Sequence, residues 1–428
     1  MNPVDLLQKE ASHVSSEERV YRERTPRSGR LYMEARRYLP GGDSRSTLFY
    51  RPYPAVMERG EGCRVVDIDG NHLLDCTGNH TVLIHGYRHP RIVEAVQLQL
   101  DKGTAFSGPT EPQIRLARML CERLPSMDLV RFTNSGTEAV LNAVRGARAF
   151  TKRRAIARIE GSYHGTLEET MASHHPDAVV LPFDDAEAAV RLIEQEHERL
   201  AAVLVEPVQG SAGMLPAEQA YLQALRDVTL RHDILLVFDE VVSFRVAYGG
   251  AQQHFGVRPD LTCLGKLIGG GFPLGAFGGR AEVMQLFDPS GGVPAVPHPG
   301  SLNANPISLA AGAATLEQLT EKSIGLLNER GAALRRTMRG RLAAAGLPVQ
   351  VTGLGSLFAI HLTAQPVRTI RDSHGSDTGR RHRLFLGLYS AGVLIDPRGV
   401  GSLSTVMAQE DLDHFIDTLA KVAPPLTV

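Results

Sequence analysis

Cysteine is scarce in this sequence: only four of its 428 residues are cysteines, Cys63, Cys76, Cys121 and Cys263. They form no Cys-x-x-Cys pair and are too few for a disulfide framework. We therefore expect a reduced, cytoplasmic protein whose thiols are buried or unreactive.

Long apolar runs and an excess of either charge are also absent. The run Ile234–Phe238, for example, has five residues, whereas a membrane span needs about 20. The first 25 residues carry many charges and lack the apolar core of a signal peptide. Because 46 Lys and Arg oppose 47 Asp and Glu, giving a formal net charge of −1, nothing attracts the whole chain to phosphate backbones or anionic lipid. We therefore expect neither a nucleic acid nor a membrane as partner.

The remaining composition is that of a globular protein. Hydrophobic residues make up 43% of the chain and charged residues 22%, which excludes a disordered or fibrous chain. The length suits two or three domains around a large core, and the sequence contains no internal repeat.

Helical and strand-like segments alternate from about residue 90 to residue 290. Apolar runs of strand length, separated by stretches of helical length, indicate an α/β fold with a mostly parallel sheet and helices on both faces. The predicted strands are 129–133, 155–160, 201–206 and 234–239, and the predicted helices are 92–100, 138–150, 186–198 and 217–231. Residues 1–60 show no clear period, and residues 64–75 are typical of a hairpin with Asp69-Gly70 as its turn.

The pattern changes after Pro306. Long helical stretches (307–340), a strand pair (349–361) and two further helices (380–391 and 409–422) predict a separate α+β lobe. We therefore divide the chain into an N-terminal segment (1–85) that contributes to the small lobe and to substrate access, a large ligand-binding domain (86–305) and a small C-terminal domain (306–428).

Three strand ends carry the chemistry, because ligands of open parallel sheets bind at the carboxyl ends of the strands. Ser135, Gly136 and Thr137 follow the first, where a helix N-terminus and two hydroxyls suit a phosphate, although an N-cap without a ligand explains them equally well. Asp239 is at the end of the second strand. It can pair with a cation or start a loop, but no His or further carboxylate lies near it at the spacing that a metal site requires. Lys266 follows the third, between apolar residues and a glycine run that favour a neutral, nucleophilic amine; a surface lysine is the alternative.

A phosphate cup, a carboxylate for a pyridinium nitrogen and a lysine for a Schiff base are together the requirements of pyridoxal 5′-phosphate (PLP). Here the chain resembles the fold-type I, class-III PLP-dependent aminotransferases, in their glutamate-1-semialdehyde aminomutase-like branch. The resemblance runs from about Leu39 to the C-terminus and includes the motifs Pro40-Gly-Gly, Asp67-Ile-Asp-Gly-Asn71, His85-Gly86, Asn134-Ser-Gly-Thr-Glu-Ala139, Tyr163-His-Gly165, Glu206-Pro-Val208, Phe238-Asp-Glu-Val241, Gly265-Lys266, Gly269-Gly-Gly-Phe-Pro273 and Asn305-Pro306. It implies a large PLP-binding domain with a mostly parallel seven-stranded sheet and a smaller α+β C-terminal domain.

The resemblance also implies roles around the cofactor ring. Lys266 binds PLP covalently and later shuttles the proton, and Asp239 keeps the ring nitrogen protonated. Tyr163 stacks on one face of the ring, Val241 packs on the other, and Glu206 is a polar group near the ring.

The phosphate contacts implied by the resemblance come from two subunits. Ser135, Gly136 and Thr137 hold the phosphate in a homodimer whose active sites lie at the subunit interface. In the family a Thr before the Asn-Pro motif reaches the neighbouring subunit's phosphate. Here that place is Ser301, which keeps the hydroxyl and lacks the methyl group.

Two arginines bear on the substrate, since a guanidinium suits a carboxylate. Arg45 lies in Gly41-Gly-Asp-Ser-Arg-Ser-Thr47, and Arg398 follows Asp396-Pro; a surface arginine is the alternative for each. Both segments are similar to those of β-amino acid aminotransferases, in which one arginine takes the donor's carboxylate and the other, movable, takes the keto acid. True aminomutases tend to carry Glu where this chain has Gly399.

The sequence therefore predicts a PLP-dependent aminotransferase that moves an amino group from a β-amino acid to a 2-oxo acid such as 2-oxoglutarate by a ping-pong mechanism. The alternatives are a glutamate-1-semialdehyde-type 2,1-aminomutase or an amino acid racemase with the same lysine chemistry. A non-catalytic module on the same fold is a more distant alternative, against which the intact Lys266 and Asp239 argue.

Overall fold

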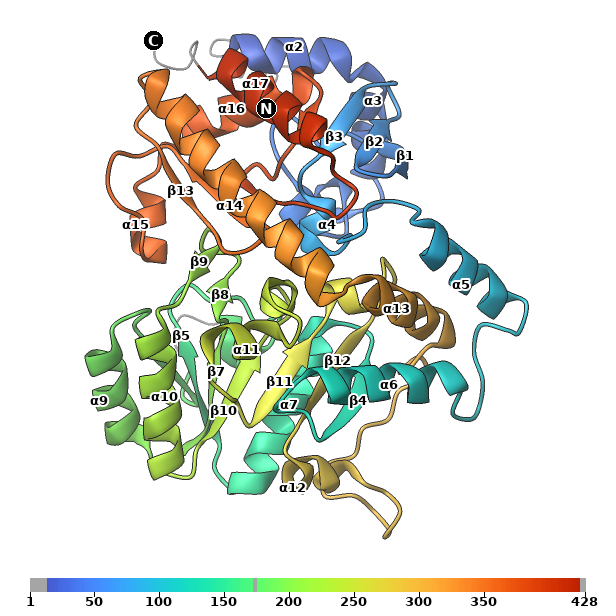
Figure 1. Cartoon of the computed structure of the whole chain (residues 1–428), viewed down its shortest axis with the longest axis vertical. Coiled ribbons are helices and arrows are strands. Elements are labelled where there is room, and N and C mark those ends of the chain that lie inside the picture. The colour runs from blue at the N-terminus through green and yellow to red at the C-terminus, as the bar shows by residue number, and fades with distance from the viewer. Residues whose placement is uncertain (1–13, 172–174, 424–428) are drawn as a thin grey trace.

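The computed structural model describes residues 14–171 and 175–423, which form two lobes (Figure 1). One lobe holds a seven-stranded sheet of order β4-β12-β11-β10-β7-β5-β6. Its strands are β4 Leu129–Thr133, β5 Ala155–Ile159, β6 Ala178–Leu181, β7 Leu200–Val205, β10 Leu235–Asp239, β11 Leu261–Leu264 and β12 Gly275–Gly279. β10 pairs in parallel with β7 and β11, whereas β12 runs antiparallel to both of its neighbours. The predicted mostly parallel sheet is confirmed.

Helices cover both faces of this sheet. Along β10, Leu235 and Val237 belong to the same buried cluster as Ala143 of α7 (Gly136–Thr151). The alternate residues Leu236 and Phe238 belong to the cluster that includes α10 (Gln219–Arg231) and α9 (Ala186–Glu196). Because successive side chains of a strand point to opposite faces, α7 and α10 lie on opposite sides of the sheet. All five residues of β10 are buried, which explains the apolar run Leu235–Phe238 that precedes Asp239.

The other lobe combines both ends of the chain. Its sheets are β1 Met57–Glu61, β2 Arg64–Asp67, β3 His72–Asp75 and β15 Val393–Leu394, and, separately, β13 Gln350–Thr352, β14 Leu357–His361 and β16 Val400–Ser402. Its long helices are α14 Glu321–Ala344, α16 Thr378–Ser390 and α17 Gln409–Val422. β15 pairs in parallel with β3, so the N-terminal segment shares a sheet with the C-terminal lobe.

The N-terminal segment is more regular than its sequence indicates. It forms α2 (Ser16–Arg24) and α3 (Pro26–Ala35), where the sequence shows no clear period. The carboxylate of Asp69, in the predicted hairpin turn, accepts hydrogen bonds from the backbone N–H groups of Arg27 (2.6 Å) and Ser28 (3.0 Å). A tertiary contact therefore supplies the cap of α3, which no local pattern could indicate.

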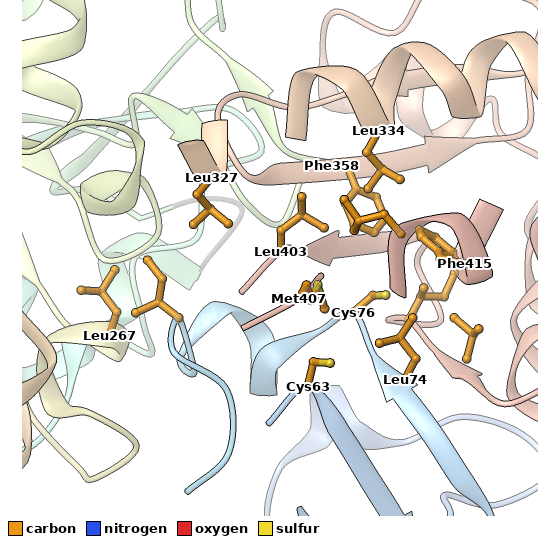
Figure 2. Close-up of a cluster of buried hydrophobic side chains, with 14 of the residues drawn as sticks. Cys63, Leu74, Cys76, Leu267, Leu327, Leu334, Phe358, Leu403, Met407 and Phe415 are labelled. Carbon is orange, nitrogen blue, oxygen red and sulfur yellow. The ribbon is translucent and has the colours of Figure 1, made fainter. Parts of the chain in front are cut away.

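A buried cluster joins the lobes (Figure 2). Leu74 and Cys76 come from the N-terminal segment, Leu403 and Phe415 from the C-terminal lobe, and Leu267 from the large domain. Leu267 directly follows the predicted nucleophile, so the backbone at this point is held by the core between the lobes.

Three helices complete the junction. α13 (Pro306–Gln318) packs on α5 (Pro90–Leu100) and α6 (Glu111–Arg123), the last of which the sequence reading did not predict.

All four cysteines are free, and burial raises the pKa of the Cys76 and Cys263 thiols well above the usual value. Within residues 14–171 and 175–423, no helix is both long enough and apolar enough to cross a membrane.

Candidate active site

A cavity of about 400 Å³ collects most of the predicted site residues. They come from distant parts of the chain, because the strand ends of the large domain, the N-terminal segment and the C-terminal lobe all face it. The predicted residues on its wall are Arg45, Gly136, Thr137, Tyr163, Glu206, Asp239, Val241, Lys266 and Arg398.

The N-terminus of α7 forms one wall of the cavity. Ser135 caps this 16-residue helix, its hydroxyl accepting a hydrogen bond from the backbone N–H of Glu138 (3.2 Å), and Ser135 itself does not line the cavity. Gly136 and Thr137 do line it. A Cβ on Gly136 would lie 2.9 Å from Cγ2 of Val241, and one on Gly165 would lie 2.4 Å from Oγ1 of Thr137. The wall therefore presents helix N–H groups that side chains on these glycines would obstruct.

Asp239 ends β10 with both carboxylate oxygens engaged. One accepts a hydrogen bond from the backbone N–H of Val241 (3.1 Å), and the other lies 2.9 Å from Nδ1 of His164. Asp239 and His164 are 4% and 2% exposed, so the pair is shielded from water. His164 is a site residue that the sequence reading missed, although it stands inside the quoted motif Tyr163-His-Gly165.

Glu206 also lines the cavity. Its carboxylate accepts hydrogen bonds from the backbone N–H of Tyr163 (2.8 Å) and that of Gly210 (3.3 Å). Burial raises the pKa of Glu206 to about 7, against the attraction of His164. Glu206 thus fixes the backbone beneath Tyr163, whose side chain stays 46% exposed at the cavity.

Lys266 follows β11 and Gly265 and opens a short 3₁₀ turn. Its φ of +49° lies in the left-handed region, which a non-glycine residue adopts only where its surroundings hold it there. Burial lowers the pKa of the Lys266 ammonium, although the carboxylates of Asp239 and Glu206 oppose this shift. In the described part of the chain no group hydrogen-bonds its Nζ, so the amine is available to a ligand.

The two arginines also face the cavity. Arg398 donates from Nε and Nη2 to the two oxygens of Asp396, each at 2.9 Å. Arg45 donates from Nη1 to Oδ1 of Asn79 (3.0 Å), and His80 Nδ1 lies 3.2 Å from Asp396. Asp396 was not predicted, although a signal existed, since it stands two residues before Arg398.

Ser301 lies apart from the cavity. It lines a separate depression with Phe106, Ala304 and Asn305. Among the described residues no cluster of three or more His, Cys, Asp or Glu side chains is arranged to hold a metal ion.

Comparison with known proteins identifies the family. Residues 48–422 match the family described as aminotransferase class-III. The chain is 42% identical over 411 residues to a glutamate-1-semialdehyde 2,1-aminomutase of Methanothermobacter thermautotrophicus, covering 92% of this chain and 97% of that protein. It is 41% identical over 404 residues to a β-phenylalanine transaminase of Variovorax paradoxus, covering 93% of each. The chain belongs to the class-III aminotransferase family.

The enzyme also matches the structure of a transaminase with PLP bound, at 37% identity and a TM-score of 0.89, over 94% of this chain and 98% of that one. PLP is the cofactor of the family. The cavity of this enzyme fits that group: it combines a lysine amine without a hydrogen-bond partner, the first two residues of a long helix (Gly136 and Thr137), a shielded carboxylate and an exposed aromatic side chain. These match an aldehyde, a phosphate, a ring nitrogen and a flat ring.

The close approach of Gly165 to Thr137 allows a test of whether the cavity wall at the N-terminus of α7 binds the cofactor. Gly165 has φ +86°, so Gly165→Ala adds backbone strain and also pushes a methyl group against Thr137. Gly70→Ala is the matched control, because Gly70 has φ +87° and open space around its Cβ position. In absorbance titrations we expect the PLP dissociation constant to rise at least about 10-fold in Gly165→Ala and to stay within about two-fold in Gly70→Ala. Equal affinities in the two variants would exclude Thr137 from the cofactor wall.

Proposed function

We propose that the enzyme transfers the amino group of a β-amino acid to a 2-oxo acid such as 2-oxoglutarate, in two half-reactions of a ping-pong mechanism. The observation that carries this proposal is the presence of two arginines, Arg45 and Arg398, on the cavity that also holds Lys266. Arg45 serves the carboxylate of the β-amino donor, and Arg398 serves the second carboxylate of a dicarboxylate acceptor. The β-phenylalanine transaminase relative supports the choice of donor.

Gly399 supports amino transfer over the aminomutase reaction. It has φ +82°, and a Cβ here would lie 2.5 Å from the carbonyl oxygen of Ile360. The Glu that aminomutases tend to carry at this place would therefore need a shifted backbone. Because an aminomutase relative is as similar as the transaminase, isomerisation remains the second candidate.

The residues divide the work as follows. Lys266 would hold the cofactor covalently and, once released by the donor, would move a proton in each half-reaction: away from the amine-bearing carbon of the donor in the first, and onto the corresponding carbon of the acceptor in the second. Asp239, oriented by His164 and the Val241 N–H, would keep the ring nitrogen protonated. When bound, PLP supplies an electron sink for the pair left on that carbon.

The remaining residues position the cofactor. The N–H groups of Gly136 and Thr137 would hold the phosphate, with Ser135 capping the helix behind them. Tyr163 and Val241 would pack against the ring, and Glu206 would support Tyr163 through its backbone.

We also propose a homodimer in which Ser301 completes the partner's phosphate site. Ser301 lines a depression with Phe106, which is 53% exposed, and the next residue, Leu302, is 57% exposed. A second depression shares Gly300, Asn303 and Ala304 with the first and is lined by Ile114 and Leu129, which are 59% and 45% exposed. Such side chains gathered on one surface are typical of a protein interface, and a second copy of the chain would cover them.

Separate measurement of the two half-reactions tests the function. Arg398→Ala is expected to lower the specificity constant for 2-oxoglutarate by roughly 10- to 150-fold, the loss of a charge-assisted contact worth about 1.5–3 kcal/mol. Pyruvate, which lacks the second carboxylate, should lose much less, and Arg45→Ala should chiefly harm the β-amino donor.

Stopped-flow traces of each variant with donor alone and acceptor alone give the comparison. Equal losses in both halves would contradict the assigned division between the arginines. Isomerisation of one amino acid without any acceptor would establish the aminomutase reaction instead.

A further inference from the structure

Arg398 is bound along one edge of its guanidinium only. Its Nε and Nη2 donate to Asp396, and its backbone N–H donates to the same carboxylate at 2.8 Å. A guanidinium has five N–H donors, so both hydrogens of Nη1 and one of Nη2 remain. Within the described residues no acceptor takes them, and the side chain is 43% exposed where it lines the cavity. A complete bidentate edge is therefore left for a ligand carboxylate.

Asp396 is itself firmly held. Its side chain is 2% exposed, and His80 provides a further contact at 3.2 Å. His80 lies in the segment Asn79–Thr81, whose three residues all have positive φ (52°, 53° and 74°). The guanidinium of Arg245, 1% exposed, donates to the carbonyl of Thr81 at 3.3 Å and to Ser356 at 2.8 Å. The buried Arg245 thus holds the last residue of this strained segment, and the segment places His80 against the partner of Arg398.

We propose that Asp396 is a positioning residue that keeps Arg398 in place and balances its charge, so that one cavity receives in turn an uncharged side chain and a second carboxylate. This inference rests on the proposed function, because it explains how two unlike substrates share Arg398. With an apolar donor the Arg398–Asp396 pair leaves no unpaired cation near the substrate. With a dicarboxylate, the free edge binds the second carboxylate while the other edge stays on Asp396. The arginine therefore remains in place, unlike the movable arginine that the resemblance implies.

Binding of unreactive acids to the PLP-loaded enzyme tests this role without turnover. Glutarate carries two carboxylates and butyrate carries one, and calorimetry measures both affinities. Asp396→Asn keeps the size of the side chain and removes the ion pair. We expect it to weaken glutarate about 10-fold, as for a coupled pair in contact, and butyrate less than about two-fold.

The same substitution in an Arg398→Ala background should change glutarate affinity less than about two-fold, since Asp396 acts through Arg398. Asp377→Asn is the matched control. Asp377 pairs with Arg380 at an N···O distance of 3.3 Å, and neither residue lines the cavity, so the affinity for both acids should stay unchanged. His80→Ala removes only the outer contact of Asp396; it should weaken glutarate about three-fold more than butyrate, and it carries the test if Asp396→Asn does not fold.

Tighter glutarate binding in Asp396→Asn would overturn the proposal, because Asp396 would then compete with the ligand for a movable Arg398. Equal weakening of glutarate and butyrate would overturn it as well. Failure of the proposed function is a separate result: wild-type enzyme would transfer no amino group to any 2-oxo acid, whatever the glutarate-to-butyrate ratio.

Discussion

Lys266→Ala is expected to lower turnover by about 10⁴- to 10⁶-fold, because one amine supplies both the covalent attachment of the cofactor and the proton transfer. The variant should still fold, since the Lys266 side chain makes no hydrogen bond in the described part of the chain and the neighbouring Leu267 keeps its place in the core. It should still bind PLP loosely, without the absorbance band of the lysine linkage.

The control for this variant is Lys322→Ala, which removes an exposed lysine at the start of α14. The chain has only six lysines, so borohydride reduction followed by peptide mapping distinguishes them readily. We expect the label on Lys266 in the wild type and in Lys322→Ala. More than trace turnover in Lys266→Ala would show that another group performs the chemistry.

Asp239→Asn is expected to slow proton abstraction by about 10²- to 10⁴-fold while the cofactor stays bound. The amide keeps the shape of the side chain and an oxygen for the Val241 N–H, but it lacks the charge that keeps a ring nitrogen protonated. Single-turnover measurement with the amino donor isolates this step from acceptor binding.

The neighbouring residue provides a matched control for Asp239. Glu240 is equally a buried carboxylate, but it points away from the cavity and accepts hydrogen bonds from the backbone and side chain of Gln252 at 3.2 and 3.0 Å. Glu240→Gln should reduce thermal stability and leave the rate of proton abstraction within about three-fold. An equal slowing in both variants would mean that Asp239 acts only through the structure of the strand end.

The buried strands were predictable because both of their faces pack against helices, so they read as continuous apolar runs. Strand β12 was not predictable, because its glycine-rich sequence Gly275-Ala-Phe-Gly-Gly279 is typical of a turn. The neighbouring backbone leaves no space for side chains at its glycines. A Cβ on Gly275 would lie 2.1 Å from the carbonyl oxygen of Ser135, and a Cβ on Gly278 would lie 2.4 Å from the carbonyl oxygen of Leu129. The reason for the composition is thus tertiary and invisible in the local pattern.

The residues of the candidate site were likewise predictable only in part. Asp239 and Lys266 stand at strand ends, and general rules for parallel sheets draw attention to such positions. His164 and Asp396 act as partners of other side chains, and neither period nor composition indicates which polar groups will meet. The pairing of Asp396 with His80 joins a loop near the C-terminus to the short helix α4 (Gly78–Thr81) in the N-terminal segment.

The shared sheet of the two chain ends also bears on how the protein is made. Arg64 pairs with Asp411, 347 positions later, and β3 can pair with β15 only after β15 has been synthesised. At synthesis rates of about 5–20 residues per second, the N-terminal segment leaves the ribosome roughly 20–70 s before that aspartate does. We expect the seven-stranded sheet, whose strands end at Gly279, to form before β15 is made, so that β3 completes its sheet with the C-terminal lobe afterwards.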